Sequence, residues 1–314
     1  MKTKVVVICM TYNHAQFIEK TLQGFVSQKV DFPVCYIVRD DASTDETADI
    51  VRRYEKKYPS LIHGIYETVN QYGIHRDMPY SQKLILETDG EYYAFCEGDD
   101  YWCDDYKLKK QVDLMDAHPN ATLCIHGHFL LNNKNEKLKP VHPYRKSGPI
   151  STKDVILEPY GMPATCSMLM RGTAIKKYPY DILKCPVGDR NRRVFLASIG
   201  TVLYIDELMS VYRINNSQSF GGKLVDYDKS LNLVREMNLF YDKFDLYTDG
   251  KYNEAISLVK EREWISHYMR FHDYKSIVNT RYYREYFPLT NKIKLFIKWR
   301  LEPLYTLYKK VNRY

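Results

Sequence analysis

The sequence lacks a long hydrophobic run, a secretory signal and a cysteine framework. Its longest strongly apolar run, Val5–Met10, is far shorter than the roughly 20 residues that span a bilayer, so we expect no transmembrane helix. The start, Met-Lys-Thr-Lys, leads into a run too short for a signal core, and no small-residue cleavage site follows it. The seven cysteines are odd in number, scattered and never spaced C-x-x-C. This pattern is typical of reduced thiols in a cytoplasmic protein.

Glycine-rich phosphate loops are also missing. No Gly-x-Gly-x-x-Gly follows the first predicted strand, and the sequence contains no Gly-Lys-Ser/Thr loop. We therefore expect neither a dinucleotide oxidoreductase nor a P-loop ATPase. If the protein binds a nucleoside diphosphate, a metal ion and side chains must hold it.

The net charge of +7 over 314 residues is concentrated near the C-terminal end. From Pro288 onward there are seven basic residues against one acid, Glu302, which gives a net charge of +6. Nucleic-acid-binding proteins usually spread their basic residues over a working face, so we expect no nucleic-acid partner. With 45% hydrophobic residues, the composition is that of an ordinary globular protein.

The N-terminal part of the chain alternates apolar runs with amphipathic stretches. We expect strands at 4–10, 34–39, 62–69 and 91–96. Three helices are expected between them: one over about 15–28, one that ends at about Lys57, and one that ends at Gly90. Ser43 or Thr44 is expected to cap the second helix. This order predicts a mostly parallel sheet with helices on both faces.

The later part of the chain is predicted to be looser and then helical. We expect a helix over 104–118, a strand over 123–131, loops and short strands over 140–186, a helix over 189–199 and a short strand over 202–205. His126 and His128 alternate along a strand and are interpreted as strand residues. Beyond Tyr227 the pattern is helical, so we predict two domains, 1–225 and 226–314.

Three polar clusters follow apolar runs in the first domain. They are Thr11-Tyr12-Asn13, Asp40-Asp41 and Glu97-Gly98-Asp99-Asp100. Ligands of an open parallel sheet bind outside the carboxyl ends of the strands, so the three clusters are expected to converge on one crevice. For any one cluster alone, ordinary turn chemistry is an equal alternative.

The acidic turn at 97–100 is the most specific of these clusters. Carboxylates on one tight turn suit Mg²⁺ or Mn²⁺, which bind through a few carboxylates and substrate phosphates. The alternative is a solvated acidic loop, but Tyr101-Trp102 directly after it indicates an anchored one. Glu97, Asp99 and Asp100 are therefore the candidate metal ligands.

At this spacing Met10–Asn13, Asp40–Asp45 and Glu97–Trp102 resemble the motifs of family-2 inverting glycosyltransferases. The resemblance covers roughly residues 1–220. It implies a GT-A-type, Rossmann-like α/β fold, with a mixed, mostly parallel sheet, and a nucleotide-sugar donor. It further implies that the base and ribose are held by Thr11, Tyr12, Asn13, Asp40, Asp41 and Asn70. Asp99 and Asp100 would lie nearest the ribose and the diphosphate-bound metal, with Glu97 where many members carry Asp.

The same resemblance indicates the residues of transfer. The family's general base usually lies in an acidic pair at a helix start, and Asp189 in Gly188-Asp189-Arg190 is the matching carboxylate. A helix N-cap is the alternative role for Asp189. Val211–Ser219 resembles the segment that closes over the donor, with Arg213 at the diphosphate or in a plain salt bridge, and with Gly221-Gly222 as a hinge.

The resulting hypothesis is an enzyme that transfers a single hexosyl or N-acetylhexosaminyl group to an acceptor hydroxyl. Processive members carry transmembrane helices and Gln-x-x-Arg-Trp, and the sequence has neither. The resemblance suggests a UDP-sugar donor and, as acceptor, a lipid-linked glycan of the bacterial surface type. The alternatives are a non-catalytic sugar- or partner-binding module of the same fold and a metal-dependent nuclease or phosphotransferase.

Residues of about 290–314 are predicted to form a basic amphipathic helix, with Trp299 near its polar boundary and a kink at Pro303. One face carries the apolar residues Ile293, Ile297, Leu301, Leu304, Tyr308 and Val311. Such a helix suits an anionic membrane surface, and packing against the catalytic domain is the alternative. We therefore expect a cytoplasmic protein in peripheral contact with the inner face of the cell membrane.

Overall fold

The computed structural model describes residues 3–71, 79–133, 135–158, 161–214 and 226–311. The chain forms two compact units, Met1–Gly221 and Gly222–Tyr314. The domain boundary predicted at 225/226 falls at the edge of 215–225, outside the described residues. Within the described ranges, no helix combines the length and the apolar content needed to cross a lipid bilayer.

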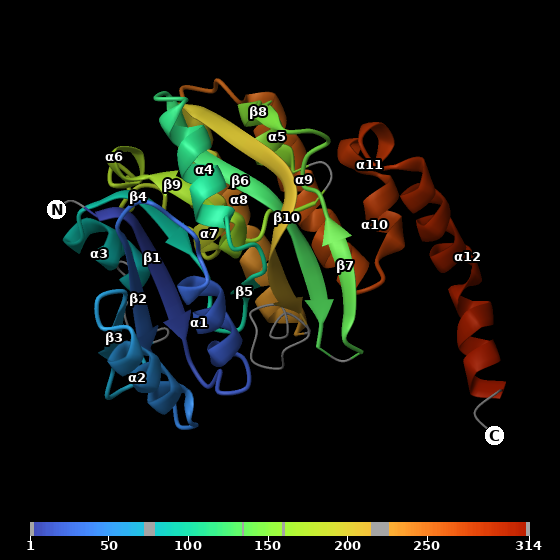
Figure 1. The fold of residues 1–314 in the computed structure, drawn as a ribbon. Helices are drawn as coiled ribbons and strands as arrows, with labels where there is room; N and C mark the ends of the chain where they lie inside the picture. The colour runs from blue at the N-terminus through green and yellow to red at the C-terminus, as the bar shows by residue number, and fades with distance from the viewer. Residues whose placement is uncertain (1–2, 72–78, 134, 159–160, 215–225, 312–314) are drawn as a thin grey trace. The chain divides into compact units, whose positions relative to one another are not determined.

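The N-terminal unit is built on one ten-stranded mixed sheet (Figure 1). Its main path runs β3-β2-β1-β4-β9-β6-β10-β5, while β7 pairs with β6 and β8 pairs with β10. The strands are β1 (Thr3–Thr11), β2 (Val34–Asp40), β3 (Ile62–Tyr66), β4 (Gly90–Phe95), β5 (Tyr101–Trp102), β6 (Ala121–Asn132), β7 (Lys137–Val141), β8 (Gly148–Ile150), β9 (Leu169–Arg171) and β10 (Thr201–Ile214). The predicted fold class is confirmed.

The central position of β1 follows from its composition. Its β-branched residues from Val5 to Ile8 are fully or almost fully buried, as expected for a strand with neighbours on both sides and helices on both faces. β1 pairs in parallel with β2 and with β4. In this register Thr11 lies opposite Asp40, and Ile8 lies opposite Phe95. The carboxyl ends of the three strands therefore meet at one edge.

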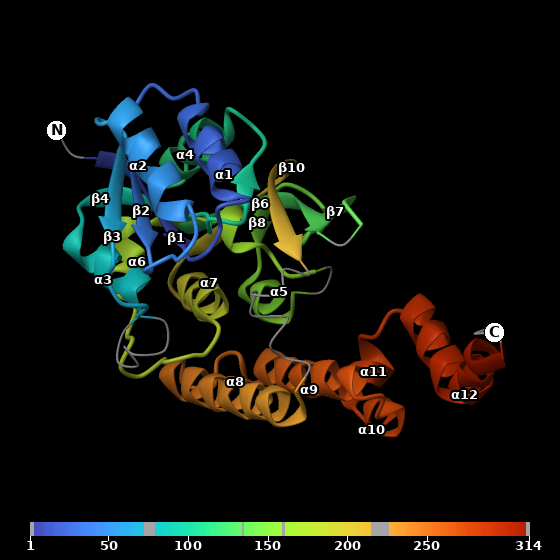
Figure 2. The same cartoon turned by 90° about the horizontal axis from the view of Figure 1, so that it is seen from below.

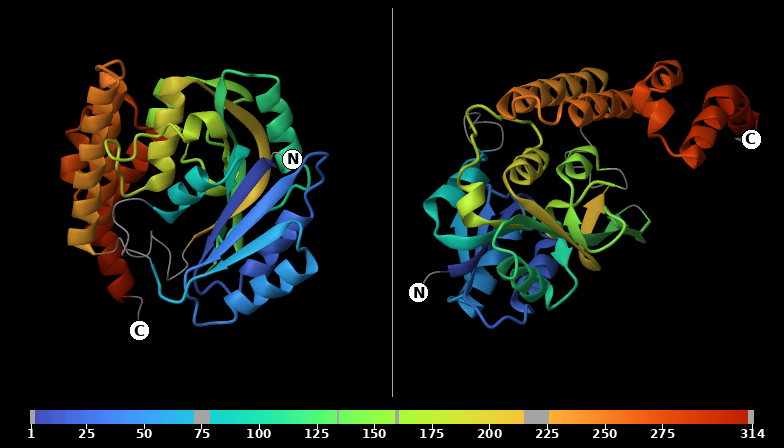
Figure 3. Two further views of the ribbon diagram at one scale, coloured as in Figure 1. Left: turned by 90° about the vertical axis from the view of Figure 1, so that its left-hand side faces the viewer. Right: turned by 90° about the horizontal axis from the view of Figure 1, so that it is seen from above.

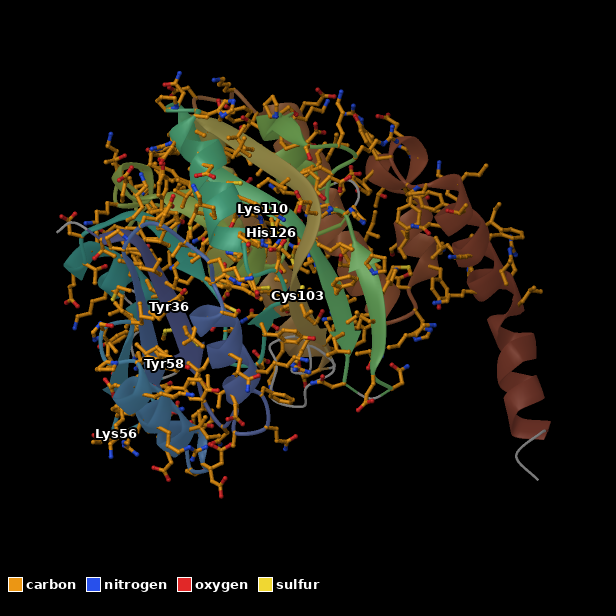
Figure 4. All side chains as sticks on the ribbon, in the orientation of Figure 1. Tyr36, Lys56, Tyr58, Cys103, Lys110 and His126 are labelled. Carbon is orange, nitrogen blue, oxygen red and sulfur yellow. The ribbon has the colours of Figure 1, made fainter. Side chains whose placement is uncertain are left out.

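Helices cover both faces of the sheet (Figure 2). One face carries α1 (Ile18–Val26), α2 (Thr47–Lys57) and α4 (Lys107–Asp116), and the other carries α5 (Thr152–Leu157) and α7 (Gly188–Ile199). The unit also contains α3 (Tyr80–Glu87), η1 (Thr165–Ser167) and α6 (Gly172–Ile175). Tyr36 of β2, labelled in Figure 4, donates its hydroxyl to the Phe25 carbonyl of α1 at 2.8 Å, which ties that helix to the sheet.

Three local predictions are wrong. Neither Ser43 nor Thr44 caps α2: Glu46 occupies the N-cap position, and Ser43 bonds to Asp40 instead. The strand expected over 202–205 runs to Ile214, because its later half pairs with both β6 and β5. The stretch 140–186 contains two short helices, α5 and α6, as well as loops and strands.

The thiols and the strand histidines agree with the sequence analysis. The structure shows no disulfide bond among the described residues, and Cys103, directly after β5, is the exposed cysteine (Figure 4). His126 and His128 are buried in β6. Burial lowers the pKa of His126 and lowers that of His128 to about 4, so both are neutral strand residues.

The C-terminal unit is helical, as predicted. It contains α8 (Tyr227–Tyr247), α9 (Asn253–Arg270), α10 (Tyr274–Val278), α11 (Arg281–Glu285) and α12 (Leu289–Val311). α8 and α9 form a helical hairpin (Figure 3). A separate small core joins α9, α10 and α12 through Ile265, Tyr274, Ile277 and Leu295.

α12 has two apolar faces. Leu295 and Trp299 pack against the small core, so Trp299 does not mark the boundary of an exposed face as expected. The other face is open to solvent: the five apolar residues Leu289, Ile293, Phe296, Ile297 and Leu301 are between 46% and 72% exposed. The apolar stripe predicted from the sequence is therefore unpacked within this unit over its described part.

Candidate functional site

The three polar clusters meet at the carboxyl edge of β1, β2 and β4. The amide of Asp41 donates to the Thr11 carbonyl at 2.9 Å, and the amide of Gly98 donates to the Met10 carbonyl at 3.0 Å. A Cβ atom on Gly98 would come within 2.5 Å of the Thr11 hydroxyl. The predicted convergence is therefore present, with β1 between the two acidic segments.

The loop after β1 is locked to the loop after β2. The Asn13 amide donates to the Ser43 hydroxyl, and the Thr44 amide donates to the Asn13 side-chain oxygen, each at 2.8 Å. Asn13 has a φ of 53°, in the left-handed region that asparagine tolerates better than most residues. Tyr12 is left 38% exposed at this edge, where its ring is accessible to a ligand.

Asp40 and Asp41 differ in their surroundings. Both carboxylate oxygens of Asp40 accept hydrogen bonds from Ser43, so this side chain shapes the turn. Asp41 accepts from the Arg39 guanidinium and from the Gln71 amide, each at 2.9 Å. The Asn70 side chain donates to the Asp41 carbonyl at 3.0 Å, which brings the loop after β3 to the same edge.

Arg39 is a residue of this edge that the sequence analysis missed. It is buried on β2 and pairs with both Asp41 and Glu67. Its guanidinium carbon lies 4.0 Å from the centre of the Tyr80 ring. An arginine inside an apolar strand was the available signal, since arginine is almost never fully buried without partners. Arg39 neutralises part of the negative charge that would otherwise gather between β2 and β3.

The acidic turn is anchored by α1. The Thr21 hydroxyl donates to the carbonyls of Gly98 and Asp100, at 3.0 and 2.6 Å. Trp102 is buried and donates its indole N–H to the Cys166 carbonyl at 3.0 Å. These bonds fix the backbone of the turn. The turn is therefore an anchored segment and not a solvated acidic loop.

Asp100 is the most perturbed carboxylate of the turn. Its side chain is buried, and one oxygen accepts from the Arg213 amide at 2.8 Å. The other oxygen, Oδ2, is buried with no hydrogen-bond partner among the described residues. Burial, reinforced by the neighbouring Asp99, raises the pKa of Asp100 well above its usual value. A buried acceptor of this kind is suited to a cation.

Glu97 lies in a different electrostatic setting. Burial and then Asp99 raise its pKa to about 8, Arg192 opposes this, and Asp189 adds to it. Within the described ranges, no three His, Cys, Asp or Glu side chains gather closely enough to hold a metal ion. The expected cluster of Glu97, Asp99 and Asp100 is therefore not preformed, and the adjacent aspartates are the better fit for a cation that also binds substrate phosphates.

His14 was also missed. Its Nε2 lies 4.0 Å from the Asp99 carboxylate, and its backbone amide donates to the Thr47 hydroxyl at 2.8 Å. Burial lowers the pKa of His14 despite the nearby aspartates. The signal in the sequence was its place directly after Asn13 in the first polar cluster.

Asp189 lies in the first turn of α7 and is 15% exposed at its side chain. One oxygen accepts from the Arg190 amide, and the other pairs with the Arg193 guanidinium, each at 2.8 Å. Asp189 is not the N-cap residue of α7, because Val187 occupies that position. It lies close enough to Glu97 and Tyr212 to raise the pKa of both.

Arg213, on the last part of β10, faces the acidic turn. Its guanidinium carbon lies 4.8 Å from the centre of the Phe17 ring and 5.2 Å from that of Tyr101. Its Nε is buried and has no hydrogen-bond partner among the described residues. A cation held over two rings beside Asp100 is available to an anionic ligand. The rest of the predicted donor-closing segment, residues 215–219, and Gly221-Gly222 lie outside the described residues.

Comparison with known proteins agrees with this geometry. The family model described as Glycosyl transferase family 2 matches residues 6–178, more than half of the chain. An uncharacterized protein of Mycobacterium tuberculosis is 32% identical over 207 residues, which cover 66% of this chain and 58% of the relative. The dTDP-rhamnosyl transferase RfbG of Shigella flexneri is 35% identical over 108 residues, 33% of this chain and 36% of its own. The chain therefore matches less than two thirds of the length of these relatives.

Two groups of solved structures share the fold. Residues 1–349 of TarS from Staphylococcus aureus, in complex with UDP-GlcNAc, match with a TM-score of 0.63 and 16% identity, over 91% of this chain and 78% of that one. The mannosyltransferase PcManGT from Pyrobaculum calidifontis, in complex with GDP-Man and Mn²⁺, matches with a TM-score of 0.55 and 14% identity, over 95% and 87%. At these identities the likeness concerns the fold alone.

Proposed function

The chain belongs to glycosyl transferase family 2, and from this premise we propose that it transfers one sugar from a nucleotide-diphosphate sugar to an acceptor hydroxyl, with inversion at the anomeric carbon. The observation that carries the proposal is the meeting of three polar loops at the ends of β1, β2 and β4, around a buried carboxylate oxygen without a partner. Ligands of open α/β sheets bind at such an edge.

In this proposal, the loops after β1, β2 and β3 hold the nucleoside. Tyr12 presents its exposed ring, while Thr11, Asn13, Asp41 and Asn70 line the adjoining edge. Asp40 supports these residues by fixing the turn through Ser43. A uridine nucleotide is proposed because the TarS structure of the same fold contains UDP-GlcNAc.

Asp99 and Asp100 are proposed to hold Mn²⁺ or Mg²⁺ together with the donor diphosphate. The unpartnered Oδ2 of Asp100 and the crowding of two carboxylates fit a divalent cation, and the PcManGT structure of this fold contains Mn²⁺. Such an ion supplies neutralisation of the charge on the leaving diphosphate. Arg213 is proposed to contact the same phosphates through its guanidinium.

Asp189 is proposed as the general base. Its carboxylate takes the proton of the acceptor hydroxyl while that oxygen forms a bond to the anomeric carbon. The bond from the anomeric carbon to the diphosphate oxygen breaks in the same displacement, and the nucleoside diphosphate leaves. The proximity of Asp189 to Glu97 of the acidic turn supports this role, because it brings α7 to the edge where the donor is proposed to bind.

Two substitutions test the separate roles proposed for Asp100 and Asp189. Asp100→Asn should abolish the Mn²⁺-dependent part of UDP-sugar binding, measured by calorimetry with and without the metal. Asp189→Asn should leave donor binding within about twofold and lower the transfer rate by about 10²–10⁴-fold, the usual contribution of a general base. Asp105→Asn, an exposed aspartate paired with Lys29 at 3.5 Å, is the matched control and should behave as wild type.

The outcome also separates the alternatives. A binding module would bind the nucleotide sugar but release no nucleoside diphosphate with any acceptor. A phosphotransferase would yield a phosphorylated product in place of a glycoside. Full turnover by Asp189→Asn would remove that residue as the base.

For the acceptor, we propose a lipid-linked glycan of the bacterial surface type, reached by a hexosyl- or N-acetylhexosaminyl-transferase bound to the inner face of the membrane. The support is the solvent-exposed apolar face of α12, flanked in sequence by Lys292, Lys294, Lys298 and Arg300. A helix with exposed apolar residues and basic neighbours binds anionic bilayers through both contributions. The relative TuaG of Bacillus subtilis, a putative teichuronic acid biosynthesis glycosyltransferase, carries a name consistent with a polysaccharide product.

The membrane proposal is tested with vesicles and the full chain. Ile293→Asp combined with Ile297→Asp should reduce sedimentation with anionic vesicles at least tenfold, and neutral vesicles should bind wild type weakly. Leu246→Asp, at a 79% exposed apolar residue of α8, is the matched control. Truncation at Pro288 is avoided because it would remove Leu295 and Trp299 from the small core. Equal sedimentation of the double variant and wild type would refute the proposal.

A further inference from the structure

A fully buried arginine connects the proposed base to a second carboxylate. Arg193 has no exposed surface, and its guanidinium pairs with Asp189 at 2.8 Å and, through its other nitrogen, with Glu158. It also donates to the Pro163 carbonyl at 3.4 Å. A buried arginine with two carboxylates is held in one orientation, because each contact is charge-assisted and directional.

Glu158 reaches this arginine from an unusual backbone position. It is the C-cap of α5, with φ 44° and ψ 58°, and its side chain is 3% exposed. A left-handed backbone at a non-glycine residue is unfavourable and persists only where surrounding contacts determine it. Arg190 approaches the second carboxylate oxygen of Glu158 at 3.8 Å. Two arginines of α7 therefore meet one buried carboxylate.

We infer that Arg193 and Glu158 are positioning residues that fix the orientation and charge of Asp189 for proton abstraction. The inference rests on the proposed function of Asp189. The helix around residue 188 carries a single acid, and Glu158 provides a second carboxylate in space from a different helix, joined to the first through Arg193.

The physical argument starts from the two oxygens of Asp189. Arg193 binds Oδ2, and the Arg190 amide binds Oδ1, so the carboxylate plane is fixed while Oδ1 keeps one lone pair for a substrate proton. Glu158 partly neutralises Arg193. The cation therefore orients Asp189 without holding the proton off as strongly as an unshared guanidinium would.

The charges around Asp189 come from three elements. Arg192 and Arg193 belong to α7, Glu97 belongs to the acidic turn, and Tyr212 belongs to β10. Burial works against the charge of Arg193, but Asp189 and Glu158 outweigh burial and raise its pKa. Arg193 is thus a permanent cation over the working pH range.

The test is the pH profile of kcat/KM for sugar transfer by the full chain. Arg193→Met should shift the acidic limb to higher pH, because the proposed base then lacks the cation that lies 2.8 Å away. It should also lower kcat/KM at neutral pH by about 10–100-fold through misorientation of the base. Glu158→Gln should shift the same limb in the opposite direction, because Arg193 then acts on Asp189 alone.

Arg193→Lys should restore part of the wild-type profile, and it serves as the readout if Arg193→Met does not fold. Arg171→Met removes another structural arginine of the same unit, bonded to the carbonyls of Ala121 and Met115, and is the matched control: it should lower the melting temperature without shifting the profile. Calorimetry should give a donor Kd within about twofold of wild type for the Arg193 and Glu158 variants.

The results distinguish failure of the proposed function from failure of the positioning role of Arg193 and Glu158. If wild type transfers no sugar from any donor, the proposed function fails. If wild type is active but Arg193→Met and Glu158→Gln keep the wild-type acidic limb, the positioning role is refuted and the network is structural only. If Arg193→Met does not fold, an unchanged limb in Glu158→Gln refutes it. A shift in the same direction for both Arg193 and Glu158 variants would also refute it.

Discussion

At the scale of single residues, buried charge is concentrated beside the candidate site. Asp100 and Lys107 are both almost inaccessible to solvent, and each has a side-chain atom without a hydrogen-bond partner among the described residues. Lys107 lies with its amine 4.0 Å from the centre of the Trp102 ring. Burial lowers the pKa of Lys107 to about 8. The acidic turn thus contains one buried carboxyl group, and a buried amine lies shortly after it in the chain, against Trp102.

Lys107 gives a prediction about stability. Its pKa is about 8 when folded and 10.5 when unfolded, so folding opposes its charge below pH 8, and this penalty is relieved as the pH rises from 8 to 10.5. Lys107→Met should raise the free energy of unfolding at pH 7 by about 1–3 kcal/mol, since the cation–π contact with Trp102 offsets part of the desolvation.

The measurement is urea denaturation of wild type and Lys107→Met between pH 7 and 10. The difference in the free energy of unfolding between the two proteins should shrink with rising pH. Comparing the two proteins at each pH cancels the contribution of other groups that titrate in this range. A difference in the free energy of unfolding that does not change with pH would contradict the prediction. It would show that Lys107 is uncharged at pH 7 or that its charge is paired with another group.

The sequence named most residues of this edge but not their individual surroundings. Asp40 and Asp41 are adjacent and chemically identical in the sequence, yet one closes a turn through Ser43 and the other pairs with Arg39. This difference depends on where the β2 strand ends and on which side chain each carboxylate meets. Likewise, the sequence around Asp189 does not reveal its link to Glu158 through Arg193, because Glu158 lies at the end of another helix.

At the scale of elements, the acidic turn is packed directly on β1. The closest contact is at Gly98, where an added Cβ would lie 2.5 Å from the Thr11 hydroxyl oxygen and 2.9 Å from a ring nitrogen of His14. Such distances require the turn or the strand to move, because the Thr11 atoms are held by the centre of the sheet. Glycine is therefore required here by close approach rather than by backbone angle.

Gly98→Ala should consequently disturb both stability and donor binding. We expect a loss of about 1–3 kcal/mol in the free energy of unfolding, the usual effect of overpacking, and at least tenfold weaker binding of UDP-sugar with Mn²⁺. Gly188→Ala is the stability control, since a Cβ there meets nothing within 4 Å. Chemical denaturation and calorimetry measure both effects, and wild-type values for Gly98→Ala would contradict the packing argument.

Element by element, the sequence predicted what depends on local periodicity. The buried run of β1 and the amphipathic pattern of α1 were enough to place both, because each pattern matches one period and one buried face. The extension of β10 to Ile214 was not predictable from periodicity. It depends on pairing with β5 and β6, which are distant in the sequence.

At the scale of the whole molecule, each of the two units contains a hydrophobic core of its own. The core of the N-terminal unit includes Val7, Phe25 and Trp102, and that of the C-terminal unit includes Ile265 and Leu295. A chain with two cores is not expected to unfold in one two-state transition. Ligands that bind one unit should stabilise that unit only.

We therefore predict two thermal transitions with different responses to ligand. UDP and Mn²⁺ at about 100 times the Kd should stabilise the N-terminal unit by about 2.7 kcal/mol, which corresponds to roughly 5–10 °C for a unit of this size, and leave the other transition unchanged. Trp102→Phe leaves two of the three tryptophans, Trp264 and Trp299, both in the C-terminal unit, as the fluorescent reporters. A single transition that shifts as a whole would contradict the independence of the cores.

By itself the sequence determined the fold class, the family and the edge of the sheet where the polar clusters meet. These depend on patterns repeated along many residues and on motifs that lie next to strands, and parallel pairing brings the strand ends together whatever the later packing. Tertiary structure alone decided that Asp189 shares Arg193 with Glu158, and that the apolar stripe of α12 stays open over its described part while Leu295 packs inside. Those facts depend on distances between segments far apart in the chain, and such distances are fixed only when the whole core is assembled.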